Sequence, residues 1–278
     1  MGVLNVTPDS FSDGGRFQQA EDAVAEALRL LDAGADILDV GGESTRPGLG
    51  DPLAAGEEQE RVLPVIEGVL KARPETVISV DTYKASTARL AVEAGAEIVN
   101  DVSGFLWDDG MAATCAELGC GVVLMHTRGR PDEWKSQPVL AADEVLPLVK
   151  RELRERLAAA LAAGVARERI VLDPGYGFGK RFEENYALLA GQGELLELGQ
   201  PLLAGVSRKS FLGRTLRPLF GGSDAPVEGR LQASMAASVA AILAGAAIIR
   251  VHDVRPAVEA ARIADAILGY PPHTPQGC

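Results

Sequence analysis

The chain has 278 residues, of which 47% are apolar and 24% are charged, and its formal net charge at pH 7 is −12. This composition is that of a globular protein and excludes general disorder. The acidic surplus argues against nucleic acid as a partner, because phosphate backbones are bound by basic surfaces. A small anionic ligand stays open, since a few local cations or a metal can reverse the field inside one cleft.

The cysteines and the first residues indicate a cytoplasmic protein. Cys115, Cys120 and Cys278 lack zinc-type spacing and are interpreted as thiols of a reducing compartment. The opening residues MGVLNVTPDS contain neither a basic segment nor a long apolar stretch. We therefore expect no signal peptide, no membrane span and no membrane partner.

Eight short apolar runs recur along the chain and predict eight strands. Each is rich in Val, Ile or Leu without polar alternation, which is typical of strands buried on both faces of a parallel sheet. In chain order they cover residues 2–6, 36–40, 76–80, 97–101, 121–125, 169–173, 201–206 and 247–251.

Segments with helical periodicity lie between these runs, for example residues 20–35, 57–72, 84–96 and 142–164. Several end in a glycine just before the next strand, which is a helix C-terminal signal: Gly34, Gly95, Gly119, Gly164 and Gly245. Eight strand–helix units in about 250 residues predict an α/β protein, a (β/α)8 TIM barrel that forms a single domain over residues 1–278. A doubly wound open sheet is the competitor, but it usually has fewer strands and a Gly-rich first turn.

Three further segments stand out. The connections over residues 7–19 and 41–56 are long and rich in Gly, Pro, Ser and Asp, so we expect binding loops there. The helix expected over residues 228–246 is apolar around most of its circumference. Such a helix must be covered on more than one side, which predicts a subunit interface.

Polar side chains gather at the ends of the predicted strands, and in a TIM barrel the C-terminal strand ends carry the chemistry. The candidates are Asn5, Asp81, Asn100, Asp101, Met125, His126, Asp173, the run Ser207–Ser210, Arg250 and His252. Because these strand ends meet at one mouth, we expect the side chains to lie close together.

Each candidate taken alone also has a structural interpretation. Asp81 or Asp101 could equally be a helix N-cap, and a histidine such as His126 is more often packed than catalytic. The pair Arg208-Lys209 is more often solvated than functional. Arg250 is harder to dismiss, because an unpaired cation in an apolar strand is costly.

The chemical types of these residues indicate a ligand. Arg250, His252 and the helix start that follows them predict an anion site, and Asn5 offers a hard oxygen suited to Mg²⁺. Asp81, Asn100 and Asp173 match a flat heterocycle with amino and ring N–H donors, on which Met125 and Phe178 could pack. The residues therefore predict a nitrogen heterocycle bound beside a phosphate group.

Eight motifs occur in the order MGVLNVTPDSFSDGG, GGESTRPG, SVDTYK, VNDVSG, LMH, LDPGYGFGK, GVSRKS and RVHDV. Together they resemble dihydropteroate synthase, a pterin-binding family, over essentially the whole chain. The resemblance implies a TIM barrel transferase of folate biosynthesis. Its partners would be 6-hydroxymethyl-7,8-dihydropterin pyrophosphate and 4-aminobenzoate, and its products dihydropteroate and pyrophosphate. One departure follows LMH, where this family commonly has Met and the chain has Thr127-Arg128.

The resemblance also implies roles for individual residues. Asp81, Asn100, Asp173 and Lys209 would hold the pterin, with Val102 and Met125 against its faces, and Asn5 would bind Mg²⁺. Arg250 and His252 would bind the pyrophosphate. The residues that would close over the reacting carbon are Asp13, Thr45 and Arg46. Phe178 and Ser210 would position 4-aminobenzoate. The catalytic set would be Asp13, Asp173, Lys209, Arg250 and His252, in a homodimer.

Two other functions fit parts of this pattern. The nearer one is a pterin-binding methyltransferase module of the methyltetrahydrofolate–corrinoid kind, which shares the barrel and some pterin carboxylates. That chemistry has no pyrophosphate to hold, so RVHDV, SRKS and the first loop tell against it. A barrel kept only for binding is disfavoured, because none of the principal strand-end groups is missing.

Overall fold

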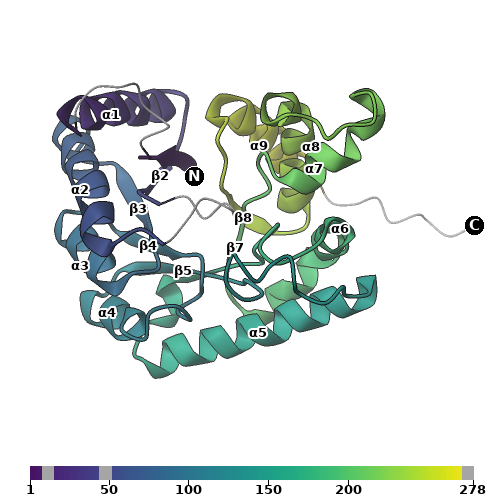
Figure 1. Cartoon of the computed structure of the whole chain (residues 1–278), viewed down its shortest axis with the longest axis horizontal. Helices are drawn as coiled ribbons and strands as arrows, with labels where there is room; N and C mark the ends of the chain where they lie inside the picture. Colours follow the sequence, from purple (N-terminus) through teal and green to yellow (C-terminus); the bar gives the residue numbers. More distant parts are fainter. Residues whose placement is uncertain (8–15, 44–51, 271–278) are drawn as a thin grey trace, which may run out of the picture.

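The computed structural model describes residues 1–7, 16–43 and 52–270 (Figure 1). Eight parallel strands form one sheet in which each strand pairs with the next along the chain. The strands are β1 Gly2–Asn5, β2 Ile37–Gly41, β3 Val77–Asp81, β4 Ile98–Asp101, β5 Gly121–Met125, β6 Ile170–Asp173, β7 Leu202–Ala204 and β8 Ala246–Ile249. The α/β class and all eight predicted strands are confirmed.

Hydrogen bonds also connect β1 with the residue that follows β8 by two positions. Gly2 and Val251 form a parallel bridge. The Val3 N–H donates to the Val251 carbonyl at 2.9 Å, and the Val251 N–H donates to the Met1 carbonyl at 3.0 Å. The first and the last strand segments of the sheet therefore lie side by side.

Helices alternate with the strands and cover the outside of the sheet (Figure 1). The α-helices are α1 Arg16–Asp32, α2 Ala55–Ala72, α3 Ala85–Glu93, α4 Met111–Leu118, α5 Ala142–Ala162, α6 Phe182–Gly191, α7 Ser210–Thr215, α8 Leu231–Leu243 and α9 Val254–Leu268. Short 3-10 helices are η2 Arg167–Arg169, η3 Gln192–Leu198, η4 Arg217–Leu219 and η5 Val227–Arg230. All five glycines predicted to end helices have positive φ, from 61° at Gly119 to 111° at Gly95, as that role requires.

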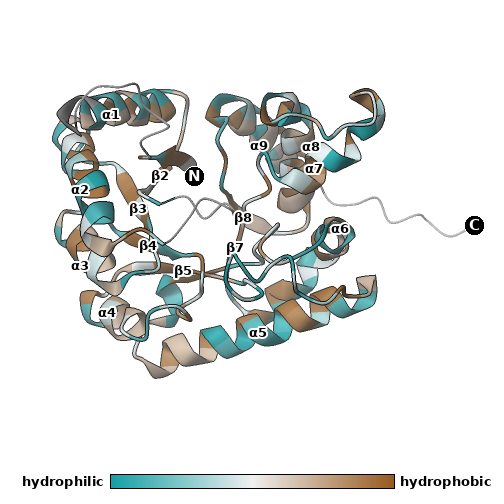
Figure 2. Cartoon of the chain, in the orientation of Figure 1, coloured by the Kyte–Doolittle hydropathy of each residue, from teal (hydrophilic) through white to brown (hydrophobic). Residues whose placement is uncertain are grey.

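The core lies between the helices and the sheet. In α2 the buried residues Val62, Val65, Ile66 and Val69 recur every three or four positions, so one face of the helix packs inward. Figure 2 shows the same division, with hydrophobic strands inside and hydrophilic residues on the outer helix surfaces. In the described part of the chain no helix is long and apolar enough to cross a bilayer.

Two expectations need correction. β8 is not buried on both faces, since Ala247 is exposed and its neighbours are half-buried. Its pairing with the three-residue β7 shifts register between Leu202 and Leu203, so this part of the sheet is less regular. The helices also begin earlier than the predicted ends of the two long loops, at Arg16 and Ala55. The remainder of both loops, residues 8–15 and 44–51, lies outside the described residues.

Candidate active site

The predicted polar residues lie at the carboxyl ends of their strands. Asn5 is the last residue of β1, Asp81 of β3, Met125 of β5 and Asp173 of β6. Asn5 is in register with Gly41, Gly41 with Asp81, and Asp81 with Asn100. One row across four neighbouring strands therefore carries three of the candidates, as expected for a parallel sheet.

Arg250, directly after β8, reaches across to the β2–β3 side of the sheet. Its Nε donates to Asp39 Oδ2 at 2.5 Å, and its Nη2 donates to Asp81 Oδ2 at 2.6 Å. Asp39 is 0% exposed and also accepts hydrogen bonds from Ser79 Oγ at 2.6 Å and Asn100 Nδ2 at 3.0 Å. A buried acid–base network thus joins β2, β3, β4 and the end of β8.

The charges of this network are set by burial and by pairing. Burial raises the pKa of Asp81 to about 7, although the Arg250 guanidinium acts in the opposite direction. Burial works against the charge of Arg250, but Asp39 and Asp81 outweigh it and raise the pKa of the guanidinium. Arg250 is therefore a fixed cation, whereas Asp81 can gain or lose a proton near neutral pH.

The end of β6 and the loop after it form the opposite side of the site. Asp173 is buried, its Oδ1 accepts the Gly175 N–H at 2.7 Å, and burial raises its pKa. The Lys209 ammonium lies 4.0 Å from the centroid of the Phe178 ring. At Gly177 a Cβ would lie 3.3 Å from Lys209 Cδ, so the glycine lets the lysine chain pass close to the loop.

Two residues of the run Ser207–Ser210 contact different partners in the segment before α9. Ser207 Oγ lies 3.1 Å from His252 Nδ1 and accepts the His252 N–H at 3.3 Å. Arg208 binds both carboxylate oxygens of Asp253, at 2.9 and 2.5 Å, so Arg208 is a structural ion pair just before α9. Burial, helped by nearby Arg250, lowers the pKa of His252 to about 3, so its ring is neutral at physiological pH.

The structure also describes three other predicted residues, whose roles stay predictions. Val102 and Met125 are buried, and Ser210 is exposed at the first position of α7. Asp13, Thr45 and Arg46 lie outside the described residues, so their predicted roles stay predictions.

The structural interpretation holds for His126, whereas neither Asp101 nor Asp81 is a helix N-cap; the residue before α4 is Gly110. His126 is fully buried and its Nε2 contacts Glu152 Oε2 at 3.0 Å, so it is a packed histidine. Asp101 accepts the N–H groups of Ser103 and Phe105 at 2.7 and 3.0 Å and caps the turn after β4. Asp81 is not a helix cap, because its carboxylate binds Arg250 and the residue before α3 is Lys84.

Sequence reasoning gave no role to Asp39 and Ser79. A signal for Asp39 was present, because a carboxylate inside the apolar run of β2 must have a partner when buried. Ser79 carried no such signal, since a serine in a strand is common and its 2.6 Å bond to Asp39 depends on the strand register.

Comparison with known proteins places the chain in a family. A family model described as pterin binding enzyme matches residues 1–252. The dihydropteroate synthase of Escherichia coli strain K12 is 46% identical over 268 residues, which cover 96% of this chain and 91% of that protein. This match is to a protein of nearly the same length, so it is not limited to a shared domain.

Solved structures of dihydropteroate synthases are also similar to this chain over nearly its whole length. Xanthomonas albilineans dihydropteroate synthase with 4-aminobenzoic acid has a TM-score of 0.86 and 44% identity, covering 98% of this chain and 93% of that one. The enzyme of the same organism in complex with 7,8-dihydropteroate has a TM-score of 0.82 and 42% identity, covering 98% and 94%. The chain therefore belongs to the pterin-binding enzymes and, within them, to the dihydropteroate synthase family.

Proposed function

We infer that the chain is a dihydropteroate synthase, a transferase that joins 6-hydroxymethyl-7,8-dihydropterin pyrophosphate to 4-aminobenzoate. The observation that carries this inference is the network in which Arg250 binds both Asp39 and Asp81, while Asn100 donates to the same buried Asp39. A single guanidinium beside acceptors and an amide suits a ligand with a polar ring at one end and an anion at the other. The relatives named dihydropteroate synthase support the same reading over a corrinoid methyltransferase module.

The two ends of the pterin substrate are assigned to different groups. Asp81, Asn100, Asp173 and Lys209 hold the pterin ring by hydrogen bonds, and Val102 and Met125 pack on its faces. The first four offer carboxylate, amide and ammonium groups that match the ring's N–H, amino and carbonyl edges. The buried Val102 and Met125 side chains supply apolar contact.

Arg250 and His252 bind the pyrophosphate. Arg250 uses Nε and one Nη2 hydrogen for the carboxylates, and a guanidinium has five N–H donors in all. Among the described residues its Nη1 group makes no hydrogen bond, which leaves donors for the anion. His252 is neutral and can donate through Nε2 while Nδ1 faces Ser207.

Bond breaking and bond making both occur at the exocyclic methylene carbon. The C–O bond to the diphosphate breaks and its electron pair leaves with the diphosphate. The aniline nitrogen then forms the C–N bond with its lone pair and loses a proton to solvent. Arg250 and His252 stabilise charge on the leaving group, while Asp173 and Asp13 stabilise the pterin cation. No strong base is required, because an aniline nitrogen is unprotonated at neutral pH.

The second substrate is positioned on the side of Phe178 and Ser210. The Phe178 ring lies under the Lys209 ammonium and edge-on to Trp134, with a ring-centroid distance of 5.1 Å. An aromatic face of this kind suits a benzoate ring, and Ser210 can donate to the carboxylate. Thr45 and Arg46 close over the reacting carbon.

Magnesium is proposed as the cofactor, with Asn5 as its protein ligand. The described residues contain no group of three His, Cys, Asp or Glu side chains placed to hold a metal. A single amide oxygen from Asn5 fits Mg²⁺, because this ion is usually held by one or two protein oxygens together with substrate phosphates. The ion would supply positive charge to the leaving diphosphate.

The assembly and the setting are also proposed. We infer a closed (β/α)8 barrel that forms one domain of a cytoplasmic homodimer. The hydrogen bonds between Val3 and Val251 support the closure. A groove of about 570 Å³ between α6 and α8 supports the dimer, because it is apolar and lined by Tyr186, Leu189, Ala190, Ala240, Leu243 and Ala244. Leu243→Glu should convert the dimer to monomers in light scattering.

The function is tested by measuring pyrophosphate release from the pterin pyrophosphate, with and without 4-aminobenzoate and Mg²⁺. We expect release that depends on both additions and equals the dihydropteroate formed. Absence of dihydropteroate under all conditions would refute the inference, and methyl transfer from methyltetrahydrofolate would favour the alternative.

A further inference from the structure

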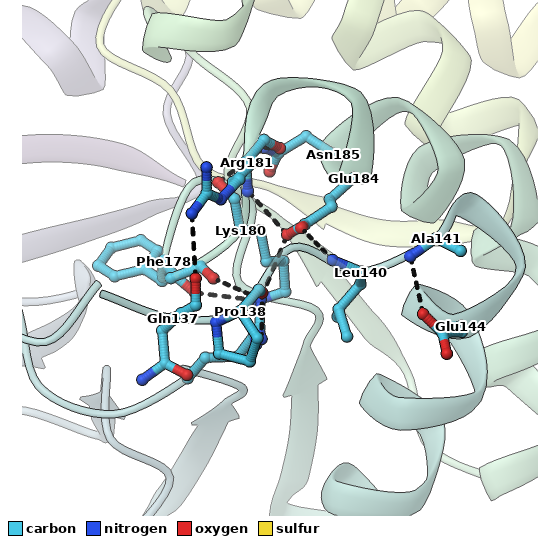
Figure 3. Close-up of polar contacts among 12 residues, drawn as sticks. Gln137, Pro138, Leu140, Ala141, Glu144, Phe178, Lys180, Arg181, Glu184 and Asn185 are labelled. Atoms are coloured by element: carbon cyan, nitrogen blue, oxygen red, sulfur yellow. Dashed lines mark hydrogen bonds and ion pairs between the residues drawn. The ribbon is translucent and has the colours of Figure 1, made fainter. Parts of the chain in front are cut away.

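The Lys180 side chain, beside the loop after β6 that carries Phe178, has no part in the reaction described above. It is 7% exposed, and its Nζ donates to three backbone carbonyls: Gly175 at 2.8 Å, His126 at 3.2 Å and Phe178 at 3.3 Å. An ammonium has three N–H donors, so three carbonyl acceptors satisfy it. Figure 3 shows Lys180 and Phe178, the pair joined by the last of these three contacts.

These three carbonyls belong to two different segments. His126 follows directly on β5, whereas Gly175 and Phe178 lie in the loop after β6. That loop contains Gly175, Gly177 and Gly179, all with positive φ, and a glycine restricts the backbone less than any other residue. Lys180 therefore ties this glycine-containing loop to the end of β5.

Arg128 makes a second tie between the same two segments. Its Nη1 donates to the Gly179 carbonyl at 3.2 Å and contacts Glu184 Oε2 at 3.4 Å. Glu184 in turn accepts the Leu140 N–H at 2.9 Å and the Arg181 N–H at 2.8 Å (Figure 3). The residues 126–141 and 174–184 are thus held together at both ends of the loop after β6.

The charge of Lys180 is costly where it lies. Burial lowers its pKa, and nearby Arg156 and Arg128 act in the same direction, while Asp173 opposes them. Among the described residues no carboxylate forms an ion pair with Lys180. An apolar side chain would avoid this cost but would leave the three carbonyls without this donor, so the amine is explained by the contacts it makes with them.

We propose that Lys180 is a positioning residue, which fixes the Phe178 loop against the end of β5 and so shapes the binding side for the aromatic amine substrate. The proposal rests on the synthase function inferred above. Phe178 should depend on this tie more than Asp173 does, because Asp173 is part of β6 whereas Phe178 lies in the loop after it and its carbonyl accepts from Lys180. Loss of the Lys180 contacts should therefore weaken the binding of 4-aminobenzoate more than the binding of the pterin.

The test compares Lys180→Met with Lys180→Gln, which keeps two N–H donors. For Lys180→Met we expect KM for 4-aminobenzoate to rise at least tenfold and the Kd of the pterin pyrophosphate to change less than threefold, with Lys180→Gln between wild type and Lys180→Met. Lys71→Met, at the exposed end of α2, is the matched surface control. Ile66→Ala, in the buried face of α2, is the control for a general loss of stability.

A second measurement does not depend on activity. The chain has two tryptophans, and in a Trp107→Phe background the emission of Trp134 reports on its contact with Phe178. Lys180→Met should change the Trp134 lifetime, and Ile66→Ala should not. If the wild-type chain lacks synthase activity, the proposed function fails while this readout still tests the tie.

Three results would overturn the proposal. One is an equal rise of both substrate constants, and another is an unchanged Trp134 signal in Lys180→Met. The third is that neither Lys180 variant folds, since that would make Lys180 a residue of general stability rather than of position.

Discussion

Arg250 and Asp39 are 211 residues apart in the chain, and the Arg250 Nε atom lies 2.5 Å from Asp39 Oδ2. The contact joins the end of β8 to the middle of β2. Together with the bond from Arg250 to Asp81, it holds the cation at the mouth of the sheet. Arg250 therefore has a structural partner in the free protein as well as a proposed anionic ligand.

Replacing Arg250 separates these two roles. Arg250→Met leaves the carboxylates of Asp39 and Asp81 buried without their cation, which should lower the free energy of unfolding by about 3–5 kcal/mol at pH 8. Turnover should fall about 100-fold or more, because the charge on the leaving group loses its donor. The double variant Arg250→Met/Asp81→Asn should recover part of the lost stability in urea unfolding, since only Asp39 then lacks its cation, but should recover no turnover. Recovery of both would contradict the proposed role.

The pH dependence of stability should carry the signature of Asp81. Its pKa is about 7 in the folded protein and 3.8 in the reference state, so between these values the folded protein binds more protons than the unfolded chain. Stability from this group is complete below pH 3.8 and is lost as pH rises through 7. The free energy of unfolding of wild type minus that of Asp81→Asn should therefore fall over this window. A pH-independent difference would contradict the assignment.

His252 should respond to pyrophosphate. Burial, Arg250, Arg208 and Lys209 hold its pKa at about 3, so ¹⁵N NMR should find a neutral ring down to about pH 5. Pyrophosphate should raise this pKa, because a bound anion favours the imidazolium. His252→Gln identifies the signal. Titration near pH 6.5 without ligand, or no change with ligand, would count against the anion site.

Gly175 should tolerate no side chain. Its φ is 70°, and a Cβ there would lie 1.9 Å from the His126 carbonyl oxygen. Gly175→Ala should lower the free energy of unfolding by about 3 kcal/mol, from strain and overpacking together. Gly119→Ala is the matched control, with φ of 61° and open space around it, and should cost about 1 kcal/mol. Equal losses in urea unfolding would show that contact with His126 is unimportant.

The sequence predicted the strands and the helix ends well because both depend on local chemistry. Buried parallel strands require continuous apolar runs, and helix ends such as Gly34 and Gly245 require positive φ. β8 was the exception, because its residues are apolar but Ala247 is exposed in the folded sheet, and its pairing with β7 is irregular.

A site residue could be predicted from the sequence when its chemical type was unusual for its position. Arg250 was predictable in this way, since a cation in an apolar strand must be paired. Its partners Asp39 and Asp81 follow only from the folded sheet. Lys180 could not be found in this way. Its acceptors are backbone carbonyls, and no pattern of side chains encodes where those will point.

A crystal structure of the chain with the pterin pyrophosphate bound tests the central claim most directly. The account predicts a pterin ring within hydrogen-bond distance of Asp173 and of Asn100 or Asp81, and a diphosphate that contacts Arg250 and His252. A ligand bound away from the strand ends, or a diphosphate that contacts neither Arg250 nor His252, would contradict it.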